Sequence, residues 1–140
     1  MSHVSKIEII INDLSSLKRA CQRLGFDFVE GQTTYAWYGR LVAPANTSLP
    51  EGVLESDLGK CDHAIRIPNA QYEVGVLSRN GRWLLLADFW DSRLRNAIGE
   101  DGGLLKQAYA IERTVQEAKR RRYRVVEQAT ETGIRLTLSA

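Results

Sequence analysis

The sequence has few of the residues that build metal centres or disulfide frameworks. Its 140 residues include two cysteines, two histidines and three prolines. Cys21 and Cys61 lack the paired spacing of a zinc site, and two cysteines so far apart predict free, mostly buried thiols in a reducing compartment. We therefore expect neither a metal nor a cofactor.

Long apolar runs and a large charge excess are also missing. The longest apolar stretches, 9–11 and 84–87, are far shorter than the roughly 20 residues that span a bilayer, and no basic segment followed by an apolar run opens the chain. This pattern predicts a cytoplasmic protein without a membrane partner. The composition, 44% hydrophobic and 26% charged, is typical of a folded chain, and the length predicts a single domain over residues 1–140.

The spacing of apolar residues predicts an α+β fold. Spacing of three and four predicts helices over 14–24, between Asp13 as N-cap and Gly25 as C-terminal stop, and over 104–122. Asn80 and Gly81 match a two-residue hairpin turn. Alternation predicts strands over 4–11, 26–30, 33–42, 61–67, 72–77, 83–90, 123–128 and 134–138. This order predicts a mainly antiparallel sheet of about six to eight strands with two helices packed on one face.

Periodicity is lost between residues 43 and 60. Prolines, glycines and small polar residues predict a long surface loop here, with a helical turn around 51–58. Long loops in compact domains often bind a partner. A second glycine-rich stretch, 99–103, lacks the lysine of a phosphate-binding loop, so we interpret it as a flexible linker that leads into a helix.

The basic residues are concentrated in one run. It comprises Lys119, Arg120, Arg121, Arg122, Tyr123 and Arg124. Outside it the chain has 14 basic and 17 acidic residues, a net charge of −3. Arginines beside an aromatic residue can pair with phosphates and stack on bases. At a helix C-terminus, however, cations complement the helix dipole. We favour the interpretation that the run caps the helix C-terminus and keeps the protein soluble. The alternative is that it contacts nucleic acid or an acidic protein surface.

An acidic residue follows the apolar run 84–87. Strand alternation places Asp88 and Trp90 on the face of Leu84 and Leu86. A buried carboxylate needs a cationic or hydrogen-bonding partner and is a candidate for function. The simpler interpretation is that Asp88 stands at the strand end and caps a turn.

No motif for catalysis is present. Cys61 and His63 fall on one face of an expected strand, but two side chains that run parallel serve neither zinc binding nor Cys/His catalysis, so we favour a structural role. The chain has no nucleophile elbow, no metalloprotease helix and no obvious pair of catalytic carboxylates. We therefore expect no enzyme.

Several short segments resemble a known family. They are Met1-Ser2-His3, Leu24-Gly25, Ala87-Asp88-Phe89-Trp90, Gln107-Ala108-Tyr109-Ala110 and Gly133-Ile134-Arg135-Leu136-Thr137-Leu138. Together they resemble the hypothetical chloroplast reading frame thirty-five family of plastids, cyanobacteria and phages, a domain of unknown function. The stretch 59–66 looks most similar to phage-type members. The resemblance implies no established activity or cofactor, and the association of members with genes for ring-type ATPases implies a partner-binding or adaptor role.

Three functional hypotheses result. The first is a non-enzymatic protein-binding module that uses Tyr35, Trp37, Asp88 and Trp90. The alternative is a nucleic-acid-binding protein that uses the run 119–124, with an affinity that falls as salt rises. The third is an enzyme centred on Asp88 and His63.

Overall fold

The computed structural model describes residues 4–39 and 53–140, and it confirms the α+β class with a mainly antiparallel sheet. The described residues form seven strands, within the predicted number, but the strands divide into two sheets. The strands are β1 (Val4–Ile11), β2 (Asp27–Glu30), β3 (His63–Arg66), β4 (Val74–Arg79), β5 (Arg82–Asp88), β6 (Arg124–Thr130) and β7 (Gly133–Ser139). The helices are α1 (Leu14–Leu24), α2 (Ser92–Ile98) and α3 (Gly103–Arg120), with 3-10 turns η1 (Glu55–Asp57) and η2 (Glu100–Gly102).

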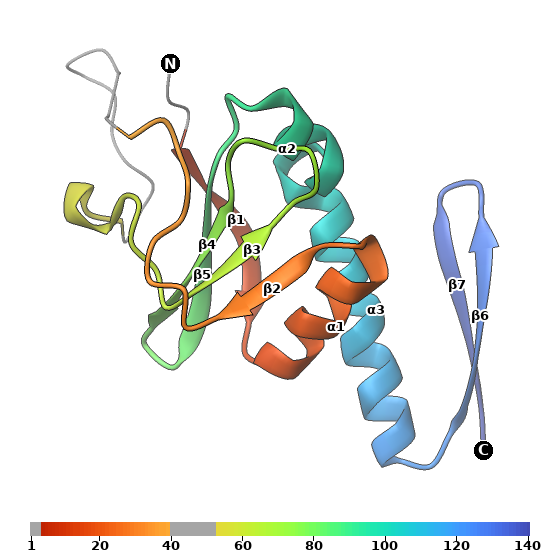
Figure 1. Ribbon diagram of the computed structural model, residues 1–140. Coiled ribbons are helices and arrows are strands. Elements are labelled where there is room, and N and C mark those ends of the chain that lie inside the picture. The colour runs from red at the N-terminus through yellow and green to blue at the C-terminus, as the bar shows by residue number, and fades with distance from the viewer. Residues whose placement is uncertain (1–3, 40–52) are drawn as a thin grey trace.

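The larger sheet has the strand order β1-β5-β4-β3-β2, and every neighbouring pair is antiparallel (Figure 1). The predicted hairpin turn joins β4 to β5: Asn80 and Gly81 have φ of 50° and 77°, as this turn type requires. β5 lies in the interior of the sheet. Its adjacent residues Leu85 and Leu86 are 1% and 0% exposed, so β5 is covered on both faces.

Most of the buried apolar side chains of the described residues belong to two clusters. In the first, sheet residues such as Ile65, Val76 and Leu85 pack with buried residues of all three α-helices. In the second, Ala64, Leu77 and Leu86 pack with Tyr35 and Val53. Neighbours along a strand point to opposite faces, so Leu85 and Leu86 assign the clusters to the two faces of β5. In Figure 1, α1 and α3 lie to one side of the sheet and η1 to the other.

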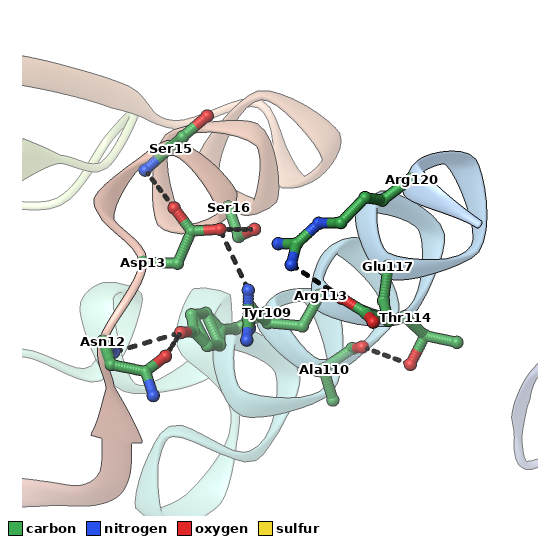
Figure 2. Close-up of polar contacts among 10 residues, drawn as sticks. All are labelled: Asn12, Asp13, Ser15, Ser16, Tyr109, Ala110, Arg113, Thr114, Glu117 and Arg120. Carbon is green, nitrogen blue, oxygen red and sulfur yellow. Dashed lines mark hydrogen bonds and ion pairs between the residues drawn. The ribbon is translucent and has the colours of Figure 1, made fainter. Parts of the chain in front are cut away.

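Polar contacts join α1 to α3 (Figure 2). Asp13 caps α1 by accepting a hydrogen bond from the Ser15 amide at 3.1 Å, and Gly25 ends the helix with φ of 79°, as predicted. Arg113 of α3 also donates to Asp13, at 3.2 Å. Beside this contact the Tyr109 hydroxyl accepts a hydrogen bond from the amide of Asn12. The entry to α1 is thus held against α3 by local and long-range hydrogen bonds.

The strands expected over 123–128 and 134–138 correspond to β6 and β7, which pair as a C-terminal hairpin but do not join the larger sheet. Figure 1 shows this hairpin beside α3, and none of its residues is buried. The turn at Thr130–Gly133 comes close to α3, because a Cβ placed on Gly133 would lie 2.5 Å from Gln107 Nε2. The hairpin is therefore largely exposed.

The segment after β2 differs from the prediction. A strand was expected over 33–42; residues 40–42 lie outside the described residues, and within 33–39 only Thr34 pairs, in an isolated bridge with Lys60. The side chains still alternate, with Tyr35 and Trp37 packed against the second cluster and Ala36 exposed, but the segment forms no ladder with a described strand. Of the expected loop 43–60, only 53–60 is described; it contains η1 and buries Val53 at 7% exposure.

A predicted strand ends early, and a turn and a short helix follow it. The strand expected over 83–90 ends at Asp88, and Asp91 caps the seven-residue α2, which the sequence analysis did not predict. Leu94 and Ile98 form its buried face. The stretch 99–103, predicted as a linker, is mostly the η2 turn and leads directly into α3. Among the described residues, no helix is long and apolar enough to cross a membrane.

Candidate functional site

Asp88, the last residue of β5, is fully buried. Its Oδ1 accepts a hydrogen bond from the Trp90 amide at 3.0 Å, and its Oδ2 accepts one from the Tyr38 amide at 3.1 Å. These bonds help to offset the cost of burying a carboxylate. The geometry is that of a side chain that caps the turn after a strand, which is the simpler of the two predicted roles.

A second carboxylate holds the other side of this turn. Asp91 Oδ2 accepts hydrogen bonds from the backbone amides of Gln71 and Tyr72 at 2.7 and 3.0 Å. Its Oδ1 accepts one from the backbone amide of Arg93 at 3.0 Å. Burial works against ionisation, but bonds from backbone amides, that of Tyr72 first, outweigh it and lower the pKa of Asp91. Asp91 is therefore ionised at neutral pH and ties the start of α2 to the segment before β4.

Trp90 lies between the two carboxylates and is 54% exposed. Beside it is a shallow hollow of about 370 Å³, lined by Gln71, Trp90, Asp91, Ser92 and Arg93. The backbone around Trp90 is thus fixed on both sides while its indole remains accessible. We call residues 88–93 and Gln71 the Trp90 corner.

The other aromatic residues of the predicted set are less exposed than Trp90. Tyr35 is 3% exposed, and burial raises its pKa to about 12. Its ring lies directly over Gly75 of β4. Trp37 is half-buried, with its indole against Gly59. Tyr35 and Asp88 therefore offer no surface to a partner, a correction to the predicted set, whereas Trp90 is well exposed and Trp37 partly so.

The structure does not bring Asp88 and His63 together. His63 aligns through Val76 with Leu85 across the sheet, and Asp88 is three residues beyond Leu85 on β5. An odd number of residues along a strand reverses the direction of the side chain, so Asp88 and His63 project from opposite faces. His63 packs instead between the rings of Phe28 and Trp83, and its Nδ1 accepts a hydrogen bond from the Gly31 amide.

Cys61 and His63 are also separated, contrary to the prediction that they share a face. β3 begins only at His63, and Cys61 precedes a bend and packs against the second cluster. The Cys61 thiol donates to the Gln32 carbonyl at 3.1 Å, and burial raises its pKa to about 11. The pKa of the buried Cys21 is raised further, to about 12. Both thiols are therefore protonated at neutral pH and poor nucleophiles.

The run 119–124 covers the end of α3, a turn and the start of β6, and all six residues are exposed. Arg120 and Arg121 contact Glu117 at 3.6 and 3.1 Å, and Figure 2 shows the first of these ion pairs. Within the described part of the chain, the remaining cations, Lys119, Arg122 and Arg124, form no ion pair.

Sequence reasoning missed a groove of about 750 Å³ beside β1 and the β4–β5 turn. Its cations are Lys6, Arg79 and Arg82. Lys6 pairs with Glu8 at 3.6 Å and Arg79 pairs with Asp57, so most of its positive charge is already balanced. The only sequence signal for it was the run of isoleucines in β1.

The described residues contain no group of His, Cys, Asp and Glu side chains arranged to hold a metal ion. Comparison with protein-family models, with curated proteins and with solved structures found no match to this chain. The candidate site is therefore defined by its own geometry, which offers an accessible aromatic surface at the Trp90 corner.

Proposed function

We propose that this protein is a non-enzymatic protein-binding module of the adaptor type, with Trp90 as the anchor of its interface. The carrying observation is that Trp90 is more than half exposed at a corner whose backbone is fixed by Asp88 and Asp91. Tryptophan is among the residues that contribute most to binding at protein interfaces, and an anchor fixed in advance loses little entropy on binding.

The rest of the fold supports a scaffold role. We infer that both long helices cover one face of the larger sheet, since their buried residues belong to the same cluster as Ile65, Val76 and Leu85. This arrangement leaves the Trp90 corner at the end of β5, between a packed sheet and α2. Rigid elements on both sides favour a preformed binding surface.

We further propose a ring-type ATPase as the partner, in host cytoplasm if the chain is phage-encoded. This proposal rests on the resemblance of the segments 87–90, 107–110 and 133–138 to the family described above. The exposed indole and the neighbouring polar groups of Gln71 and Arg93 suit a partner surface that combines an apolar pocket with a polar rim.

The test begins with affinity purification of the tagged protein from its native cells, with and without nuclease. We expect a stoichiometric partner that survives nuclease treatment. The affinity of that purified partner is then measured for the wild type, for Trp90→Ala and for Ile10→Ala. Loss of a tryptophan anchor should weaken binding about 30-fold, as hot-spot truncations do.

Ile10→Ala is the matched control, because Ile10 is 63% exposed and lies on β1, away from the Trp90 corner. It should bind like the wild type. If Trp90→Ala keeps both its fold and its affinity, Trp90 is not the anchor. If no partner survives nuclease in any preparation, the adaptor proposal is wrong.

Nucleic-acid binding through the run 119–124 is the second candidate, favoured by the three exposed cations that Glu117 does not neutralise. The triple variant Lys119→Gln, Arg122→Gln, Arg124→Gln should bind DNA or RNA more weakly than wild type. Its plot of log affinity against log salt should be shallower by about 0.7–0.9 for each phosphate that the variant no longer neutralises. Arg120→Gln with Arg121→Gln is the control, and equal binding by the triple variant and the wild type would reject this function.

A further inference from the structure

The β6–β7 hairpin is held to the rest of the chain by few contacts. Arg23 of α1 donates to Glu127 at 2.6 Å, and the turn near Gly133 approaches Gln107. No described strand pairs with the outer edge of either β6 or β7. A two-stranded hairpin is at best marginally stable alone in water, and it gains stability when a further strand is added.

The two faces of this hairpin differ in polarity. Cross-strand partners share a face, and one face carries Val125 opposite Leu138, Glu127 opposite Leu136, and Ala129 opposite Ile134. Five of these six residues are apolar, and the sixth, Glu127, pairs with Arg23 of α1. Ile134 and Leu138 are 36% and 44% exposed. The opposite face carries Arg124, Gln128 and Arg135 with hydroxyl residues and Val126.

We propose that a second copy of this chain pairs with this hairpin, through antiparallel alignment of the two β7 strands about a two-fold axis at Leu136. Full overlap of the seven-residue strands sets Leu136 opposite Leu136 of the second copy and Ile134 opposite its Leu138. Because the interface is isologous, each contact occurs twice. The two hairpins become one four-stranded sheet with a continuous aliphatic stripe along its centre.

The charges are compatible with self-pairing of β7, and they favour β7 over β6. In the β7 seam, the one charged residue, Arg135, faces Thr137 of the second copy, so no like charges meet. The same full overlap of β6, centred on its middle residue, would set Glu127 against Glu127 of the second copy. Like charges directly opposite each other are destabilising, and Glu127 is already engaged by Arg23. This interface involves none of the residues at the Trp90 corner, so it stands apart from the proposed function.

Two substitutions of Thr137 that introduce opposite charges, made in the full-length protein, test the β7–β7 interface. Thr137→Glu places a carboxylate opposite Arg135 of the second copy at two symmetric positions, and Thr137→Arg places a like charge there. From the range for single cross-strand pairs, we expect the dimer dissociation constant to fall about two- to thirtyfold in the first variant and to rise by a similar factor in the second. Sedimentation equilibrium from the micromolar to the millimolar range measures this constant, with circular dichroism as a check on the fold.

Val126→Glu and Val126→Arg are the matched controls. Val126 pairs with Thr137 inside the hairpin, lies on the same face and is 49% exposed, but it is outside the proposed seam. These variants should leave the dissociation constant within about twofold of wild type. The proposal would be overturned if the chain stays monomeric over the whole concentration range. It would also be overturned if the Thr137 substitutions leave the dissociation constant unchanged, or if the Val126 substitutions change it instead.

Discussion

At the scale of single residues, close packing decides which side chain Gly75 can carry. The Tyr35 ring covers the position where a Cβ would be, and that atom would lie 2.6 Å from Tyr35 Cε1. Overpacking of this kind costs about 1–3 kcal/mol. We therefore predict that Gly75→Ala lowers the free energy of unfolding by that amount, as measured by urea denaturation.

Gly103→Ala is the control for this prediction. Gly103 begins α3 with φ of −58°, and a Cβ there meets nothing within 4 Å. Alanine should stabilise the protein by about 0.4–1 kcal/mol, because it reduces the entropy of the unfolded chain. A Gly75→Ala protein as stable as wild type would mean that Tyr35 does not cover β4 in solution.

Asp13 makes stability depend on pH. A hydrogen bond from the Ser16 hydroxyl, against the opposing effect of burial and with help from Arg113, lowers the pKa of Asp13 below its ordinary value. Its charged form therefore stabilises the fold fully above the unfolded-state pKa of about 3.9, and this contribution is lost as pH falls through the lower folded-state pKa.

We predict that below about pH 4 the unfolding free energy of the wild type falls more steeply than that of Asp13→Asn. Asparagine keeps an N-cap acceptor but has no charge to lose. Asp13→Ala should cost about 1 kcal/mol at neutral pH because the cap is removed. Parallel pH profiles for wild type and Asp13→Asn would contradict the prediction.

At the scale of elements, one arginine joins α1, α3 and the hairpin. Arg23 Nη2 donates to Glu112 of α3 at 2.8 Å, and Nη1 donates to Glu127 of β6 at 2.6 Å. The two carboxylates differ in burial: the side chain of Glu112 is 10% exposed and that of Glu127 is 39% exposed. The Glu112 pair should therefore contribute more to stability than the Glu127 pair.

We predict that Arg23→Ala destabilises the protein by about 1–3 kcal/mol, because a nearly buried carboxylate loses its cation. Adding Glu112→Gln should recover part of that loss, since a neutral amide costs less to bury. Glu127→Gln alone should cost less than about 1 kcal/mol. Urea denaturation of the wild type and these three variants checks the values, and a Glu127→Gln protein that loses as much stability as Arg23→Ala would contradict the assignment.

The elements that could be predicted from the sequence are those with local signals. α1 has a cap at Asp13 and a stop at Gly25, and the β4–β5 turn has Asn80 and Gly81. α2 was missed because its seven residues offer only Leu94 and Ile98 as an apolar repeat. Segment 33–39 was misassigned because its aromatic residues cover the sheet rather than extend it.

The candidate site could be predicted only in part, for a related reason. Trp90 was in the predicted set and is exposed, but the sequence does not show which segments cover Tyr35 and Asp88. Burial of those residues depends on how the chain around residues 35–38 and 53–61 folds over β4 and β5. The division into two sheets likewise depends on contacts between distant strands, which alternation alone does not specify.

At the scale of the whole molecule, the hairpin is separable from the larger sheet. No residue of β6 or β7 is buried, whereas both core clusters are complete without them. We predict that a chain ending at Arg124 folds cooperatively. Its free energy of unfolding should be lower by about 1 kcal/mol, because the exposed ion pair between Arg23 and Glu127 is lost. Keeping Tyr123 preserves the bond from its amide to the Ala118 carbonyl, which closes α3.

Urea denaturation of the shortened and full-length chains checks this prediction. The slope of the unfolding free energy against urea should fall only slightly, because little apolar area of the hairpin is buried on folding. The shortened chain should also remain monomeric at concentrations where the full-length protein forms the proposed β7 dimer. A shortened chain that is unfolded would show that the hairpin is integral to the core, and a shortened chain that still dimerises would place the self-association elsewhere.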